Sequence, residues 1–368
     1  MDRIRLRRAL AAQRAYCEQR SPFYAAVLRE LEADAHAAWL EAAEHAWRDR
    51  RFAVDWEAAH LLLACLHFWA LRGASDEPQC GGSAELAALY PSCGGSGGDP
   101  GGAVKAFLDR APAEFWERLR VGTVQTNEVG RSIAWMLAAA AAFGGRGMPF
   151  HLVELGASAG LNLIGDHLPQ ACRFTGQDAT RPEPPAGWNR VHPALTRTGL
   201  DLCPRRLSDP QDRLWLKACV WADDFPRLER LDRATGIFLH MEGKPGGPQL
   251  VRCAFADAPA WLLANRRARP QQGLLVFNSI ATIYLDEADY GSLRRGMASA
   301  LAPWQDRALW VEYERARGAS AGPLELMVHR VVDGRLQSRV LASGAPRPVE
   351  LRVHEHWGFL GEGESLMR

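Results

Sequence analysis

Residues 150–164 constrain the fold of this chain more than any other segment. An apolar run ends at an acid, Glu154, and the turn Gly-Ala-Ser-Ala-Gly over residues 156–160 precedes a second apolar run. Because glycine lacks a Cβ and tolerates left-handed backbone conformations, this pattern predicts a strand, a tight loop and a helix. Such a loop lets backbone N–H groups approach a ligand closely, and the acid can accept hydrogen bonds from hydroxyl or amino groups.

Strand-like and helix-like segments alternate after residue 150. Apolar runs over 324–332 and 336–341, on either side of Asp333-Gly334, predict an antiparallel hairpin, whereas the Pro-rich residues 170–196 predict irregular structure. The other predicted strands are 151–155, 199–204, 249–255, 273–279 and 307–313, and the predicted helices are 161–168, 211–231, 260–267 and 287–301. This alternation predicts an α/β fold with an open, mostly parallel sheet and a late antiparallel hairpin.

The first 120 residues carry helical patterns instead. Ser21 and Pro22 combine an N-cap with a proline at the first helical position, and residues 56–71 are apolar on nearly every side, which is typical of a buried helix. Residues 73–102 are rich in glycine and predict a flexible linker. We therefore expect two domains, a helical N-terminal cap region over 1–120 that contains this linker and an α/β domain over 121–368.

Composition argues against several classes of function. The 44 Lys and Arg residues nearly balance the 43 Asp and Glu residues, so no global basic field indicates nucleic-acid binding. No apolar run approaches the roughly 20 residues that span a bilayer, and no signal-peptide pattern opens the chain. The eight cysteines include no Cys-x-x-Cys pair. We expect a cytoplasmic protein with reduced thiols that binds neither nucleic acid nor membrane, in an oligomeric state that the sequence leaves open.

Polar or small residues follow the ends of several predicted strands. They are the stretch from Glu154 to Asn162, Asp201, the pair Asp257-Ala258 and the pair Asn278-Ser279. Ligands of an open parallel sheet bind outside the carboxyl ends of its strands, so these groups should meet at one edge. A helix predicted over 128–143 should run antiparallel to the strand that follows it, which brings its start, Thr126-Asn127-Glu128, and also Arg131 to the same edge.

Three of these segments carry a resemblance to a known class of enzymes. The stretch from Glu154 to Gly160 resembles the first motif of S-adenosylmethionine-dependent methyltransferases, an acid followed by Gly-x-Gly-x-Gly, with Ser158 at the middle glycine. Residues 199–204 resemble the second motif, whose acid, here Asp201, binds the ribose hydroxyls, and Asp257-Ala258 resembles the pair that contacts adenine. Asp201 comes about 40 residues after the loop, where about 20 is usual for a dinucleotide fold, and the Pro-rich segment accounts for the excess.

The resemblance implies a Rossmann-like domain over 121–368 that uses S-adenosylmethionine to methylate an unknown small molecule. The cofactor-binding residues that it implies, together with the predicted helix start, are Asn127, Glu154, Gly156, Ala157, Ser158, Gly160, Asn162, Asp201, Asp257 and Ala258. Methyl transfer is an in-line displacement that depends mainly on orientation. We expect Glu128 to bind the amine end of the cofactor or to act as a base, Arg131 to neutralise a substrate anion, and Asn278 to orient the acceptor.

Most of residues 50–360 also resembles a bacterial family that is known only as a domain of unknown function. The matching segments are Thr126-Asn127-Glu128 with Arg131, the stretch from Glu154 to Asn162, residues 197–204 and residues 215–221. This resemblance indicates family membership and implies no reaction.

Two alternative functions stay open. The domain is either an enzyme or a regulatory protein that binds a nucleotide or adenosyl ligand without chemistry. The loop also spells Gly-x-Ser-x-Gly, which in a serine hydrolase would make Ser158 the nucleophile, with Asp257 or Asp333 and His354 or His356 as partners. The context disfavours the hydrolase, because helical segments rather than strands precede the loop and no His-Gly-Gly segment is present.

The remaining titratable residues give weaker signals. We expect no metal site, because His60 and His67 on one helix and His354 and His356 near the C-terminus each lack further ligands. Packed core positions are the expected role of His60 and His67. Glu312 and Glu314, near a strand end, are either substrate contacts or exposed residues.

Overall fold

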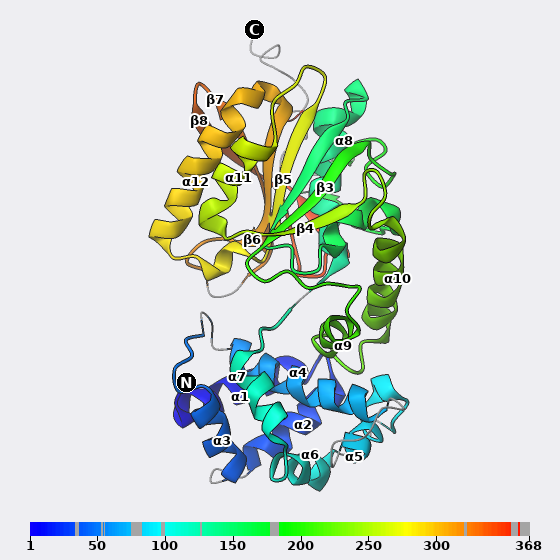
Figure 1. Ribbon diagram of the computed structural model, residues 1–368, viewed down its shortest axis with the longest axis vertical. Helices are drawn as coiled ribbons and strands as arrows, with labels where there is room; N and C mark the ends of the chain where they lie inside the picture. The colour runs from blue at the N-terminus through cyan, green and yellow to red at the C-terminus, as the bar shows by residue number, and fades with distance from the viewer. Residues whose placement is uncertain are drawn as a thin grey trace. The chain divides into compact units, whose positions relative to one another are not determined.

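The computed structural model describes residues 1–33, 37–52, 54, 56–74, 83–96, 100–125, 127–176, 184–319, 322–354 and 360. The chain forms two compact units, which we call the helical unit (residues 1–126 and 208–231) and the sheet unit (residues 127–207 and 232–368) (Figure 1). This division differs from a single boundary near residue 120, because residues 208–231 join the helical unit. Trp215 lies in the core of that unit and donates a hydrogen bond from Nε1 to the carbonyl of Thr123 at 3.0 Å.

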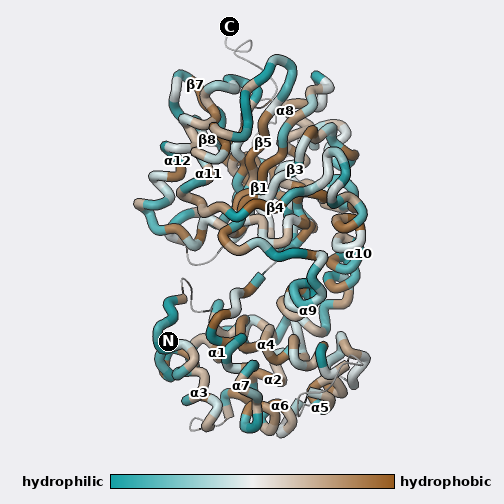
Figure 2. The backbone as a smooth tube through the Cα atoms, viewed as in Figure 1, coloured by the Kyte–Doolittle hydropathy of each residue, from teal (hydrophilic) through white to brown (hydrophobic). Residues whose placement is uncertain are grey.

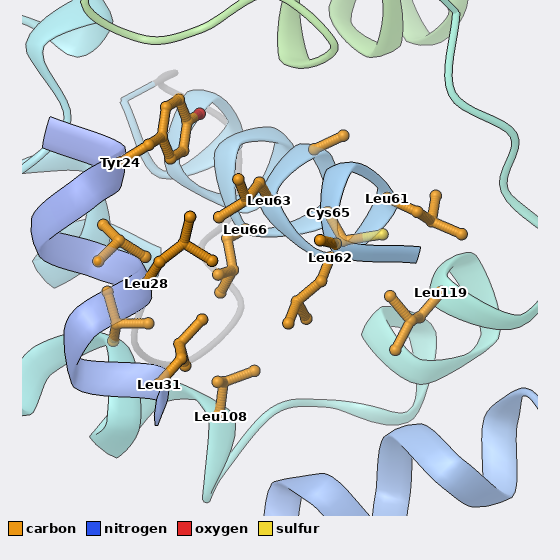
Figure 3. Packing of buried hydrophobic residues seen from close by; sticks show 14 of the residues in the cluster. Tyr24, Leu28, Leu31, Leu61, Leu62, Leu63, Cys65, Leu66, Leu108 and Leu119 are labelled. Carbon is orange, nitrogen blue, oxygen red and sulfur yellow. The ribbon is translucent and has the colours of Figure 1, made fainter. Parts of the chain in front are cut away.

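The helical unit packs around one long buried helix. Its elements are α1 (Arg3–Cys17), α2 (Pro22–Ala33), α3 (Ala38–Ala46), α4 (Trp56–Gly73), α5 (Ser83–Ala87), η1 (Pro91–Cys93), α6 (Gly101–Leu108), α7 (Ala113–Val121), α9 (Pro210–Ala218) and the start of α10 (Phe225–Met241). Leucines of α4 meet leucines of α2 in the core shown in Figure 3. The Ser21 hydroxyl caps α2 by accepting a hydrogen bond from the Tyr24 amide at 3.2 Å, as predicted. Within the predicted linker 73–102, residues 83–87 and 91–93 form α5 and η1 instead, and residues 75–82 and 97–99 lie outside the described residues.

The sheet unit contains a nine-stranded sheet in the described residues. Its spatial order is β2 (Arg173–Gly176), β9 (Glu350–Val353), β8 (Arg335–Gly344), β7 (Leu324–Val332), β6 (Ala308–Arg315), β5 (Gly273–Ser279), β1 (Phe150–Leu155), β3 (Ala194–Asp201) and β4 (Pro248–Arg252). The strands from β6 to β4 are parallel, and β7 and β8 add antiparallel neighbours. The predicted α/β class, the mostly parallel sheet and the late antiparallel hairpin are therefore confirmed.

Helices cover both faces of the central strands. Helix α8 (Ile133–Phe143) packs on one face, and α11 (Ala258–Asn265) and α12 (Glu287–Leu301) pack on the other (Figure 1). Because successive side chains of a strand point to opposite faces, Phe150 and Leu152 of β1 pack with α8, while Val153 and Leu155 pack with α11 and α12. Burial on both faces explains why β1 and β5 are mostly hydrophobic in colour in Figure 2.

Several predicted elements differ from the structure. Residues 161–168 form a 3₁₀ helix, η4 (Leu161–His167), rather than an α-helix. The segment expected to be irregular, 170–196, contains β2 and the start of β3. The predicted helix 211–231 is two helices, α9 and α10, and Pro226 lies in the first turn of α10, where a proline is tolerated.

Candidate functional site

The order of the strands reverses between β1 and β5. From β1 the chain continues outward through β3 and β4 on one side, and then through β5 and β6 on the other side. The loops that leave β1 and β5 therefore diverge at their carboxyl ends. In open α/β sheets this reversal is where ligands bind, which makes the carboxyl end of β1 the candidate site.

The glycines of the loop after β1 are required by packing within the chain. Gly156 and Gly160 have φ angles of 69° and 71°, a conformation that glycine adopts readily. A Cβ added at Gly156 would lie 2.7 Å from the Cβ of Ala281, and one added at Gly160 would lie 2.8 Å from Leu250 Cδ2. Close approach of neighbouring side chains therefore accounts for both glycines.

Ser158 lies at the centre of this loop in a strained conformation. Its φ angle is 52°, which is uncommon for a residue other than glycine. The Ser158 amide donates to Asp201 Oδ2 at 2.7 Å, and the Cys203 amide donates to Asp201 Oδ1 at 2.8 Å. The acid expected to bind ribose thus holds the end of β3 against the loop, and each of its oxygens keeps one further lone pair.

The start of the helical segment before β1 contacts the same loop. Asn127 Nδ2 donates to Ser158 Oγ at 3.1 Å, which places the two segments at one edge of the sheet, as the connectivity predicted. The segment begins with a 3₁₀ turn, η2 (Val129–Ser132), before α8. The carboxylate of Glu128 caps η2 by accepting from the Gly130 amide at 3.2 Å. Thr126 lies outside the described residues.

Glu154 is a buried acid whose carboxylate is only partly satisfied. Its side chain lies on the α8 face, the residue is 2% exposed, and Asn162 Nδ2 donates to its Oε1 at 3.0 Å. Glu154 Oε2 and Asn162 Oδ1 are both buried and have no hydrogen-bond partner among the described residues. Burial raises the pKa of Glu154 to about 8; the Asn162 hydrogen bond opposes this rise, the charge of Asp201 adds to it, and Arg131 lowers it. When the carboxyl is ionised, both of these atoms are acceptors that a hydrogen-bond donor would satisfy.

Arg131 and Glu128 lie at the same edge and are buried. Arg131 Nε donates to the carbonyl of Pro346 at 2.9 Å, and its charge acts on Glu154. The structure therefore brings together Asn127, Glu128, Arg131, Glu154, Ser158, Asn162 and Asp201.

The loop after β5 packs against the loop after β1. Ala281 contacts Gly156, and the preceding residue, Ile280, has a φ angle of 46°, which is strained for a β-branched side chain. Glu314 Oε1 fixes this loop by accepting from the amides of Ala281 at 2.8 Å and Thr282 at 3.1 Å. Burial, reinforced by the charge of Glu312, raises the pKa of Glu314 to about 7. The two strained loops flank the strand reversal, where strain is commonly functional.

Asn278 does not join the residues around Glu154. It follows Leu274 and Val276 on the face that packs with α11 and α12, opposite to Glu154. Its Nδ2 donates to Glu312 Oε1 at 3.2 Å and to Glu314 Oε1 at 2.8 Å, and its Oδ1 accepts from Trp310 at 2.7 Å. These protein groups use both amide hydrogens, so the geometry does not favour the expected role of Asn278 in orienting an acceptor.

The expected adenine-binding pair lies at the start of α11. Asp257, in η5 (Phe255–Asp257), is exposed, and Ala258 is buried in the core between the sheet and α11. Only Asp257 is therefore accessible to a ligand.

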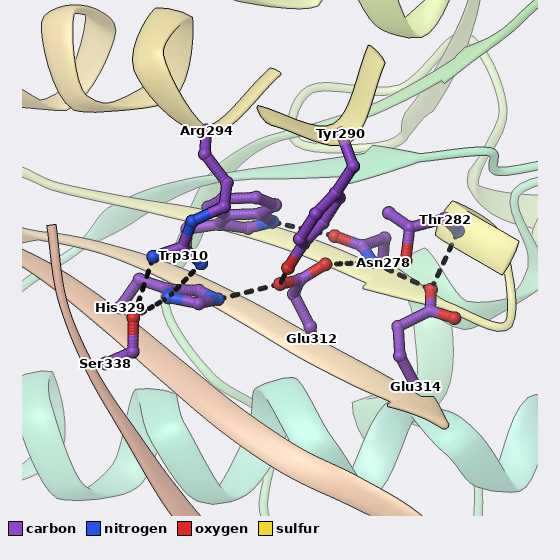
Figure 4. Close-up of polar contacts among 9 residues, drawn as sticks. All are labelled: Asn278, Thr282, Tyr290, Arg294, Trp310, Glu312, Glu314, His329 and Ser338. Atoms are coloured by element: carbon purple, nitrogen blue, oxygen red, sulfur yellow. Dashed lines mark hydrogen bonds and ion pairs between the residues drawn. The ribbon is translucent and has the colours of Figure 1, made fainter. Parts of the chain in front are cut away.

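Glu312 and Glu314 are buried rather than exposed, and they belong to a second polar cluster on the α12 face. Figure 4 shows its members, which are Asn278, Thr282, Tyr290, Arg294, Trp310, Glu312, Glu314, His329 and Ser338. The roles of Tyr290, Arg294, His329 and Ser338 were not predicted from the sequence. The available signal was two acids at alternate positions of a strand that is otherwise apolar, which require buried partners.

The described residues hold no cluster of three metal-ligating side chains. His60 and His67 pack against aromatic rings of the helical core, as expected. His354 Nε2 bonds Ser343 Oγ at 2.8 Å, and His356 lies outside the described residues. Within the described part of the chain, no helix is both long and apolar enough to cross a membrane, and every cysteine is a free thiol.

Two of the expected partners of a Ser158 nucleophile, His354 and Asp333, lie far from it in the sheet. His354 follows β9, five strand spacings from β1, which is roughly 24 Å at about 4.8 Å per strand. Asp333 lies in the turn between β7 and β8, beyond the amino end of β6, and therefore at the edge of the sheet opposite to Ser158. This placement argues against a serine hydrolase built on Ser158.

Comparison with models of known families identifies the family of this chain. The family described as "Uncharacterized protein conserved in bacteria (DUF2332)" matches residues 7–352. The chain belongs to this family. The match confirms the predicted resemblance to a bacterial family of unknown function, and the description of the family names no reaction or ligand. No curated protein matches the sequence.

Proposed function

We propose that this protein is an S-adenosylmethionine-dependent methyltransferase that acts on a small molecule and binds its cofactor at the carboxyl end of β1. The observation that carries the proposal is the pair of buried acceptors without partners, Glu154 Oε2 and Asn162 Oδ1. An unsatisfied buried acceptor costs about 1–3 kcal/mol, so a ligand that supplies donors there recovers that cost.

The amino-acid end of S-adenosylmethionine supplies such donors. Its ammonium group carries three N–H donors and a positive charge, which suit two acceptors of which one belongs to a carboxylate. Asp201 retains lone pairs for ribose hydroxyls, and the exposed Asp257 is accessible to the adenine ring. These features support the cofactor set predicted from the sequence, except that the side chain of the buried Ala258 takes no part.

The chemistry requires little from the protein beyond orientation. S-adenosylmethionine supplies an electrophilic sulfonium methyl, and its transfer is an in-line displacement. Arg131 is a buried cation at the same edge, suited to a carboxylate or phosphate on the acceptor. Glu128 either binds the cofactor amine or accepts a proton from the acceptor, although its Oε1 also caps η2.

Isothermal titration with S-adenosylmethionine and with its demethylated product tests the binding step. We expect saturable binding of both ligands, weakened at least tenfold by Glu154→Gln at pH 8.5 and unchanged by Glu242→Gln, which alters an exposed acid of the same unit. Absence of heat at high micromolar ligand, or equal affinity of the two variants, contradicts the proposal.

Transfer of a labelled methyl group to a pool of small molecules from bacterial extract separates an enzyme from a binding protein. We expect label in an acceptor that depends on Glu154. Binding without transfer supports the second candidate, a non-catalytic regulatory protein that holds an adenosyl ligand.

A further inference from the structure

Three residues on the α12 face of the sheet form a directed chain of hydrogen bonds. Ser338 Oγ lies 2.7 Å from His329 Nδ1, and His329 Nε2 lies 2.8 Å from Glu312 Oε2 (Figure 4). His329 faces both partners across the sheet, because it pairs with Trp310 of β6 and with Ser338 of β8. The order serine, histidine, carboxylate is that of a nucleophile, its base and the group that orients the base.

The partners of His329 fix which of its nitrogens carries the proton. Arg294 Nη1, which can only donate, lies 3.5 Å from Nδ1, so Nδ1 is an acceptor. Nε2 therefore bears the hydrogen and donates it to Glu312. The Ser338 hydroxyl then donates to Nδ1 and accepts from Arg294 Nη2 at 3.2 Å. From Ser338 through His329 to Glu312, each hydrogen bond has the donor and the acceptor that activation of a serine requires.

Glu312 is held in place by further donors. Tyr290 donates from its hydroxyl to Glu312 Oε2 at 2.7 Å, and Asn278 donates to Oε1 at 3.2 Å. Burial by itself would raise the pKa of Glu312, but hydrogen bonds from His329, Tyr290 and Asn278 outweigh it and lower the pKa. An ionised carboxylate is thus present beside a histidine that is completely buried.

Ser338 differs from its two partners in being exposed to solvent. A reagent can therefore reach its hydroxyl while His329 and Glu312 stay inside the protein. Among the described residues no carboxylate forms an ion pair with Arg294, so its guanidinium remains available for negative charge that develops beside Ser338.

We propose that Ser338, His329 and Glu312 form a second catalytic site, separate from the loop after β1, which hydrolyses small carboxylic esters. Ser338 Oγ bonds to the acyl carbon while its proton passes to His329 Nδ1, and Arg294 donates to the carbonyl oxygen as it becomes negative. The bond to the alcohol oxygen breaks, and that oxygen takes the proton from His329. Water then releases the carboxylic acid by the same route and restores Ser338.

Another serine–histidine contact, in the helical unit, lacks the charged partner. Ser92 Oγ lies 2.7 Å from His67 Nε2, but His67 Nδ1 faces the carbonyls of Ala218 and Val220 at 3.1 and 3.0 Å. These neutral groups stabilise an imidazolium less than a carboxylate does. Burial lowers the pKa of His67 to about 4, which makes it a weak base. Ser338 is therefore the nucleophile that the contacts favour.

Labelling of the full-length protein with a fluorophosphonate locates an activated serine, because the serine oxygen displaces fluoride from phosphorus. Peptide mapping of the wild-type protein requires no variant, and we expect the label on Ser338. We expect the labelling rate to fall at least 100-fold in His329→Gln and to be unchanged in Ser299→Ala, which alters another exposed serine of the sheet unit.

Hydrolysis of p-nitrophenyl acetate gives the second readout. We expect turnover to be lost in Ser338→Ala and retained in Ser92→Ala and Ser299→Ala. Because Ser338 is exposed, its replacement by alanine should leave the protein folded, so the loss would report on the hydroxyl itself. Label on Ser92 or Ser158, no label on Ser338, or equal turnover in Ser338→Ala and wild type would overturn the proposal. None of these outcomes depends on methyl-donor binding.

Discussion

Asn162 donates a hydrogen bond of 3.0 Å to one oxygen of Glu154, while the other oxygen of that carboxylate stays buried without a partner among the described residues. This pair joins η4 to the end of β1 at the strand reversal. It is the feature of the sheet unit that most clearly calls for a ligand, because buried acceptors are normally satisfied within the protein.

The buried carboxyl of Glu154 makes the free protein less stable at alkaline pH. Its pKa of about 8 lies above the ordinary value of 4.5, so the native state binds more protons than the unfolded state between these values. The free energy of unfolding therefore falls as pH rises from 4.5 towards 8. In urea titrations we expect Glu154→Gln to flatten this dependence and Glu242→Gln to leave it unchanged. If the free energy of unfolding of Glu154→Gln depended on pH as steeply as that of the wild type, Glu154 would not be the source of the pH dependence.

Gly156 tests the close packing of the two loops. Alanine there meets both an unfavourable φ angle and the Cβ of Ala281, whereas alanine at Gly243 meets a similar φ angle of 77° but nothing within 4 Å. We expect Gly243→Ala to cost about 1 kcal/mol and Gly156→Ala to cost about 2 kcal/mol more, measured by denaturant unfolding. Equal losses in the two variants would mean that the loop after β5 can move away from Gly156 without a cost in stability.

Asp166 and Arg197 form a buried ion pair that joins η4 to β3. Arg197 donates through Nη1 and Nη2 to the two carboxylate oxygens at 2.8 Å each, and both side chains are almost completely buried. Removing one charge leaves the other unpaired inside the protein, so we expect Asp166→Asn to lower the free energy of unfolding by about 3–5 kcal/mol. The exposed pair of Arg146 and Asp306 supplies the control, since Asp306→Asn should cost less than about 1 kcal/mol. Comparable losses in the two variants would contradict this difference.

Local signals were sufficient for many elements of the sheet unit. The bounds of β5 and α12 coincide with the predicted ranges, because each is a continuous pattern flanked by clear turn or capping residues. Asp333 and Gly334 have φ angles of 50° and 74°, as the dipeptide predicted for a tight hairpin. By contrast, β2 and β9 are four-residue strands that pair across a long sequence separation, so nothing local marks either of them.

The candidate site was predictable only in part, and for a physical reason. Connectivity placed Asn127 beside Ser158 correctly, because an antiparallel helix before β1 must begin at its carboxyl end. Sequence could not show that Asn278 is saturated by Glu312 and Glu314, since those contacts form only when β5 and β6 pair. The role of His329 could not be predicted for the same reason, because its partners lie on two other strands.

Proton release during binding tests the central claim most directly, because it reports on Glu154 itself. Titration of S-adenosylmethionine at pH 7.5, in buffers of different ionisation enthalpy, measures this release. A cationic ligand group beside Glu154 lowers its pKa from about 8, so we predict that wild-type protein releases more protons on binding than Glu154→Gln does. Equal proton release by the two proteins, or no binding by the wild type, would contradict a ligand site at Glu154.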